Sequence, residues 1–237
     1  MNFDMGATFY KILRTTAKLV RIQTIRQTCL NAHRADRDDG FILACTHLSH
    51  LEPIVLSAAI RRQVHWMARK EFYENRLSAF ILNASGAIQI DRFGSPMPGI
   101  RAAARVAAEG KCIGIFPEGG VAQGSKSVLR GGPIKSGVCT IAIQADVPVV
   151  PAVILGTDKL TSVKSWIPFS RTPLCFAFGN DIRPPALIGS RRTRRIRMTK
   201  VVEHEFQQIY VDLITRLGIN DSLITQVACD HSSGPLL

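Results

Sequence analysis

Short apolar runs alternate with amphipathic stretches along most of the chain. Runs typical of buried strands cover residues 40–45, 64–68, 87–90, 112–116, 147–155 and 174–178. Segments with helical spacing of apolar residues lie between and after them, at 53–60, 71–84, 98–109, 137–145 and 191–217. Such alternation predicts an α/β fold with a mostly parallel central sheet flanked by helices.

The N-terminal segment, residues 1–35, predicts a basic amphipathic helix. One face carries basic residues at helical spacing, namely Lys11, Arg14, Lys18 and Arg21. The other face carries apolar residues, namely Phe9, Ile12, Leu13, Ala17 and Val20. Two interpretations stay open: an interfacial anchor lying on anionic lipid, or an ordinary surface helix whose apolar face packs on the core.

The length predicts one main domain. A chain of 237 residues buries one sizeable core, and no long linker or repeat divides it. We expect this domain over residues 36–220, followed by a C-terminal tail over 221–237. No apolar run reaches the length of a membrane span, and the N-terminus lacks the apolar core of a secretion signal. Six cysteines without C-x-x-C spacing suggest reduced thiols in a cytoplasmic protein.

The formal net charge of +12 predicts a polyanionic partner, either nucleic acid or the anionic surface of a membrane. Nothing resembling a helix-turn-helix, a zinc finger or an RNP aromatic pattern accompanies the charge, so we expect no nucleic acid. A dense basic cluster at residues 191–200 opens the last long helix. Its plainest interpretation is a solvated helix start, although a cluster this dense is also suited to phosphate.

An imidazole and a carboxylate stand five residues apart where the first apolar strand gives way to a helix. His47 and Glu52 would face different sides of a continuous helix, so only a turn brings them together. Pro53 supports that turn because proline disfavours a helical backbone at the residue before it. His47, His50 and Glu52 lack the two-sided spacing of a zinc site, so we expect no metal.

Four motifs in order resemble the glycerolipid acyltransferases, the family of 1-acylglycerol-3-phosphate acyltransferases. The NHxSxxD motif of that family is similar to Thr46-His47-Leu48-Ser49-His50-Leu51-Glu52. A Lys-x2-Leu-x6-Gly-x12-Arg frame is similar in spacing to Arg69, Phe72, Ala79 and Arg92. FPEGTR is similar to Phe116-Pro117-Glu118-Gly119-Gly120-Val121, and a VPxxPV strand to Val147-Pro148-Val149-Val150-Pro151-Ala152.

The resemblance implies an O-acyltransferase that needs no cofactor. It would move a fatty acyl group from acyl-CoA or acyl carrier protein to the hydroxyl of a lysophospholipid such as 1-acylglycerol-3-phosphate. His47 would act as the general base and Glu52 would orient it. The resemblance places Ser49, Arg92, Glu118 and Gly119 at the substrate site, Ser49 by ordering its loop. The enzyme would work peripherally on the cytoplasmic face of a membrane.

Two departures from the family pattern leave alternatives open. Glu52 is one methylene longer than the usual Asp, and Val121 replaces an arginine that follows EGT in many members. Lys126, Arg130 or Lys135 would supply the missing phosphate contact, or the acceptor carries no phosphate. A catalytically impaired relative that binds lipid or acyl carrier without turnover is the remaining alternative.

Overall fold

The computed structural model describes residues 5–122, 124–157, 159, 172–186 and 188–218. The expected tail at 221–237 lies outside the described residues. The strands are β1 (Ile25–Leu30), β2 (Phe41–Cys45), β3 (Val64–Arg69), β4 (Ile88–Ile90), β5 (Cys112–Ile115), β6 (Val149–Leu155) and β7 (Thr172–Phe178). The helices of eight or more residues are α1 (Met5–Thr24), α2 (Glu52–Ala59), α3 (Arg76–Ala84), α4 (Met97–Ala108), α5 (Gly137–Ala145) and α6 (Arg191–Leu217).

A seven-stranded sheet in the order β1-β7-β6-β2-β5-β3-β4 forms the centre of the molecule. Strands β6, β2, β5, β3 and β4 pair in parallel, and β7 pairs antiparallel with β6. Every residue of the central strand β2 is buried, which matches its uninterrupted apolar sequence. The expected mostly parallel α/β fold is confirmed, and the five parallel strands bring their carboxyl ends to one edge.

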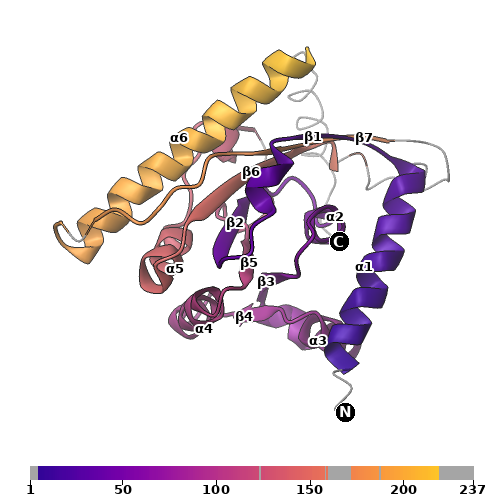
Figure 1. Cartoon of the computed structure of the whole chain (residues 1–237). Coiled ribbons are helices and arrows are strands. Elements are labelled where there is room, and N and C mark those ends of the chain that lie inside the picture. The colour runs from indigo at the N-terminus through magenta and orange to yellow at the C-terminus, as the bar shows by residue number, and fades with distance from the viewer. Residues whose placement is uncertain (1–4, 123, 158, 160–171, 187, 219–237) are drawn as a thin grey trace, which may run out of the picture.

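Helices cover both faces of the sheet (Figure 1). On one face α4, α5 and α6 pack on an apolar cluster that includes Ile113, Ile141 and Phe206. On the other face α2 packs on a second cluster that includes Phe41, Leu56 and Phe176. Helix α1 packs along α2 and α3 at the edge of this second layer (Figure 1).

The N-terminal segment differs from the expectation in two ways. Residues 25–30, expected to be helical, form the edge strand β1, which pairs in parallel with β7. Arg14, expected on a solvated or lipid-facing basic face of α1, instead turns inward and donates to the carbonyl of Ile60, while Ile12 is 62% exposed, which agrees with the open interpretation of an interfacial anchor. The side chains of Phe9, Leu13 and Arg21 lie outside the part that the structure describes.

His65 on β3 makes the stability of the fold pH-dependent. Its Nδ1 lies 2.9 Å from the carbonyl oxygen of Gly86, so this nitrogen carries the proton. Burial lowers the pKa of His65 below its ordinary value of 6.5. The unfolded chain therefore binds a proton at higher pH than the folded one, and stability falls as the pH drops through about 6.5.

We expect His65→Asn, which retains a donor for Gly86, to reduce this loss. Urea unfolding at pH 7.5 and pH 5.5 measures the loss of unfolding free energy between these pH values for the wild type and the variant. The variant should lose less stability than the wild type between these pH values. An equal loss would mean that other groups carry the acid sensitivity.

Candidate active site

The candidate active site lies at the carboxyl edge of the five parallel strands. The loop after β2 carries His47, and the loops after β4 and β5 carry Arg92 and the segment from Phe116 to Gly119. Helix α2 begins at Glu52, one residue earlier than expected, with Pro53 directly behind it. Proline fits this first turn because its missing N–H has no partner there.

His47 and Glu52 form the expected pair. The Nδ1 atom of His47 lies 3.1 Å from Oε2 of Glu52, whose side chain is fully buried. A carboxylate accepts hydrogen bonds, so Nδ1 carries the proton in the neutral ring. The free nitrogen, Nε2, is then the acceptor available to a substrate hydroxyl.

The second carboxylate oxygen of Glu52 is held by three donors. The backbone N–H groups of Leu48 and Ser49 donate to Oε1 at 3.1 and 2.6 Å. The hydroxyl of Thr157, just beyond β6, donates to the same oxygen at 2.6 Å. These contacts stabilise a buried carboxylate and fix which oxygen faces His47, so the longer glutamate side chain is accommodated in a defined position.

Glu118 fixes the backbone on which His47 sits. One carboxylate oxygen accepts the N–H of His47 at 2.9 Å, and the other accepts Ser127 Oγ and the N–H of Val128, each at 2.9 Å. Burial raises the pKa of Glu118, and the donors of Val128, His47 and Ser127 oppose that rise. Glu118 therefore connects the loops after β2 and β5.

Two aromatic rings support one face of the His47 imidazole. Phe116 stacks on His47 with ring centroids 4.1 Å apart, and Trp66 stacks on Phe116 at 4.9 Å. The indole N–H of Trp66 donates to Ser57 Oγ at 2.9 Å. Gly114 leaves space for this stack, because a Cβ there would lie 2.5 Å from the Trp66 ring.

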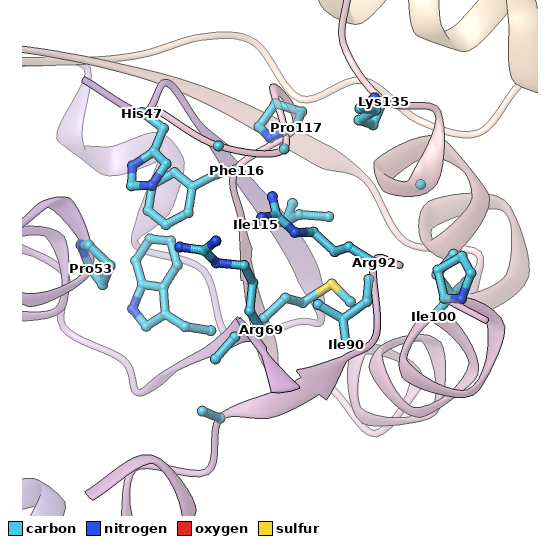
Figure 2. Close-up of a pocket in the computed structure, with 18 of the residues that line it drawn as sticks. His47, Pro53, Arg69, Ile90, Arg92, Ile100, Ile115, Phe116, Pro117 and Lys135 are labelled. Atoms are coloured by element: carbon cyan, nitrogen blue, oxygen red, sulfur yellow. The ribbon is translucent and has the colours of Figure 1, made fainter. Parts of the chain in front are cut away.

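His47 opens on a cavity of about 1970 Å³ that reaches from α1 and α3 to the start of α6. Figure 2 shows Arg69 and Arg92 extending toward the space beside His47 and Phe116. The cavity's cationic lining residues are Arg14, Arg69, Arg92, Lys135, Arg191, Arg194 and Arg195. Among the described residues no aspartate or glutamate lines it, so its field favours anions.

Arg69 and Arg92 are the two cavity cations best suited to bind a phosphate. Neither makes an ion pair with a carboxylate among the described residues, whereas the adjacent Lys70 and Asp91 pair with each other. Burial lowers the pKa of Arg92, and the neighbouring charge of Arg69 adds to that effect. The charge of Glu71 opposes both effects, although no ion pair joins it to either arginine among the described residues. Two close guanidinium groups of this kind are suited to bind a phosphate.

The structure brings together only some of the expected substrate residues. His47, Arg92 and Gly119 line the cavity; Gly119 does so with φ +80°, a conformation that favours glycine. Ser49 and Glu118 lie behind it. The Ser49 hydroxyl accepts the N–H of Leu51, in keeping with a loop-ordering role rather than a substrate contact.

The structure does not place Lys126 and Arg130, two expected substrate residues, on the cavity. Lys126 is exposed in a 3-10 turn between β5 and α5, and Arg130 lies over the ring of Tyr210 at 5.5 Å. Lys135, the third cation considered for this contact, does line the cavity. Sequence reasoning also missed Thr157, which nothing local marks as a partner of Glu52.

No group of three or more His, Cys, Asp and Glu side chains in the described ranges is placed to hold a metal ion. Within those same ranges, no helix is both long and apolar enough to cross a bilayer.

Comparison with known proteins agrees with this arrangement. The model of the Acyltransferase family matches residues 26–155, more than half of the chain. A 1-acyl-sn-glycerol-3-phosphate acyltransferase of Bacillus subtilis (strain 168) is 34% identical over 130 residues, covering 54% of this chain and 62% of that protein. One from Streptococcus pneumoniae (strain ATCC BAA-255 / R6) is 26% identical over 149 residues, covering 62% of this chain and 52% of that protein. Each match thus spans less than two thirds of the relative's own length.

A solved structure shares the fold. The crystal structure of the 1-acyl-sn-glycerophosphate (LPA) acyltransferase PlsC from Thermotoga maritima superposes with a TM-score of 0.64 at 18% identity, covering 86% of this chain and 80% of that chain. The matched family region runs from the second residue of β1 to the end of β6 and therefore includes both His47 and Glu52. By the extent of the family match, this chain belongs to the Acyltransferase family.

Proposed function

We propose that the chain transfers a fatty acyl group from an acyl thioester, acyl-CoA or acyl carrier protein, to the hydroxyl of a lysophospholipid such as 1-acylglycerol-3-phosphate. The observation that carries this proposal is the His47–Glu52 pair opening on a cavity with both apolar surface and unpaired guanidinium groups. The relatives' names support the same activity.

The dyad suits direct transfer to an alcohol. Nε2 of His47 accepts the hydroxyl proton while the hydroxyl oxygen attacks the thioester carbonyl carbon. Glu52 stabilises the imidazolium that forms. When the tetrahedral intermediate collapses, the C–S bond breaks and the leaving thiolate takes the proton from His47. No covalent enzyme intermediate is required, because the thioester is already activated.

Arg69 and Arg92 supply the headgroup site of this proposal. A phosphate between them would offset the mutual repulsion of two guanidinium groups, neither of which forms an ion pair with a carboxylate among the described residues. The apolar part of the cavity, lined by residues such as Ile54, Trp66 and Ile81, is suited to a fatty chain. The lysolipid would therefore lie with its headgroup near β4 and its chain toward α2 and α3.

We also propose that α1 and α3 rest on an anionic membrane, at the cytoplasmic face. Helix α1 exposes Ile12, Leu19 and Ile22 together with the cations Lys11 and Lys18. Helix α3 buries none of its residues and exposes Leu77, Phe80 and Ile81 beside the cavity. Apolar residues with a cationic border match the chemistry of an anionic lipid surface.

The test is thiol release from long-chain acyl-CoA and acyl carrier protein by the purified full chain. A panel of lysolipid acceptors should include lysophosphatidate and its phosphate-free counterpart, monoacylglycerol. We expect release that depends on the acceptor and is fastest with lysophosphatidate. Vesicle binding without release from either donor would instead support the lipid-binding relative without turnover.

Replacing Arg92 by methionine should lower kcat/KM for lysophosphatidate by about tenfold to a hundredfold, because a charged hydrogen bond to phosphate contributes about 1.5–3 kcal/mol. The loss should be much smaller for any turnover with monoacylglycerol. Lys126→Met removes the same charge outside the cavity and serves as the matched control. Equal losses for the two acceptors would place Arg92 outside the headgroup site.

A further inference from the structure

The cavity contains a second group of cations, contributed by α6. Arg191 and Arg195 line it from the first turns of α6, opposite the start of α5. They stand four residues apart, on one face of the helix. Neither pairs with a carboxylate among the described residues.

This arrangement works against the stability of α6. Cations in the first turn oppose the helix dipole, and like charges at i and i+4 repel each other. No acidic residue lies in the first turn to offset them. Arg194 between them has a structural role, because its Nε and a terminal amino group donate to the carbonyl of Pro185. Arg191 and Arg195 have no such partner in the described part of the chain.

The polarity of the cavity changes between its two ends. Toward α2 and α3 the lining is mainly apolar, as a fatty chain requires. Toward α5 and α6 the lining includes Ser136, Thr140 and Gln144, at and along α5, together with the two arginines. Polar groups beside cations match the chemistry of a phosphopantetheine arm, whose amides and hydroxyl separate the thioester sulfur from a phosphate.

We propose that Arg191 and Arg195 bind the phosphate of the phosphopantetheine group that carries the donor acyl chain. This inference rests on the proposed acyl transfer and assigns the binding site of its acyl donor. The thioester would lie at His47, the pantetheine arm would run past the start of α5, and the phosphate would reach α6. Acyl-CoA and acyl carrier protein share this phosphate, so either donor would use the same two arginines.

The first test is direct binding of CoA and of phosphopantetheinylated carrier protein, which needs no turnover. The full chain is compared with the double variant Arg191→Gln/Arg195→Gln. We expect the variant to bind both carriers at least about tenfold more weakly, as expected for lost charged hydrogen bonds to phosphate. The matched control is Arg192→Gln/Arg197→Gln, which removes two exposed cations of α6 that do not line the cavity. It should bind both carriers as the wild type does.

Thermal unfolding distinguishes a binding role from a structural one. Because Arg191 in the first turn opposes the helix dipole and the two arginines repel each other, Arg191→Gln/Arg195→Gln should unfold at the same temperature as the wild type or higher. Weaker binding in a protein of undiminished stability is the expected combination. A lower unfolding temperature with unchanged binding would overturn the proposal, as would equal weakening in the matched control.

Kinetics separate the donor site from the acceptor site. In the double variant the donor KM should rise while the lysophosphatidate KM stays unchanged, and an acyl-pantetheine donor without phosphate should react equally with both proteins. A raised acceptor KM instead would assign the arginines to the acceptor. If the wild type shows no transfer at all, the proposed function fails, and the binding comparison still decides whether these arginines hold the phosphate.

Discussion

His47→Ala should lower kcat for acyl transfer by about 10²–10⁴-fold, the range expected when a positioned general base is lost. No other described histidine combines a cavity position with a carboxylate on its ring. The measurement is thiol release under saturating donor and acceptor. Binding of the lysolipid and the carrier should persist, because the cationic parts of the cavity remain.

His50 provides the matched comparison for this experiment. It also lines the cavity, and its ring centroid lies 5.8 Å from that of His47, but among the described residues no carboxylate bonds to its ring. We therefore expect His50→Ala to lower kcat by less than about tenfold. A larger loss of kcat in His50→Ala than in His47→Ala would show that His50, and not His47, is the general base.

Glu52→Gln should reduce kcat to a similar extent, by about 10²–10⁴-fold, although the replacement is nearly isosteric. Three donors converge on Oε1, so the glutamine carbonyl oxygen must stay at that position. Its NH₂ group then faces Nδ1 of His47, which has to become an acceptor. The proton moves to Nε2, and the ring has no free nitrogen to offer the substrate hydroxyl.

Glu52→Asp is the informative companion to this variant. Aspartate keeps the charge but is too short to retain all four contacts, and a displacement of about 1 Å is enough to cost about a hundredfold in rate. We expect a loss that is smaller than that of Glu52→Gln. Activity equal to the wild type in Glu52→Gln would show that the tautomer of His47 does not limit transfer.

The sequence predicts the central sheet well because its signals are local. Buried parallel strands such as β2 and β6 are uninterrupted apolar runs, and proline and glycine mark the ends of their neighbouring helices. Strand β1 escapes this reasoning. Its sequence, Ile25 to Leu30, mixes polar and apolar residues at the sheet edge, and it is ordered by pairing with β7, about 150 residues later in the chain.

Contacts across long sequence distances explain the other differences. Helical spacing groups Arg14 with Lys11 and Lys18 on the basic face of α1. In the structure its guanidinium instead turns inward and donates to the carbonyl of Ile60. Thr157 reaches Glu52 across 105 positions of sequence. The basic start of α6 reads as a solvated face until the fold places Arg191 and Arg195 on the cavity. The local sequence motif identifies the pair of His47 and Glu52, whereas the residues that line the cavity are brought together only by tertiary packing.

The stack of His47, Phe116 and Trp66 has a consequence for the fate of the acyl group. A base that activates an alcohol also activates water, and water would release the donor's acyl group as a free fatty acid. Because Phe116 covers one face of the imidazole, and Glu52 occupies Nδ1, a reacting hydroxyl has to approach along the remaining ring edge. Aromatic side chains that form no bond with either substrate would thus leave one approach to the base, so a bound acceptor that fills this edge also keeps water from it.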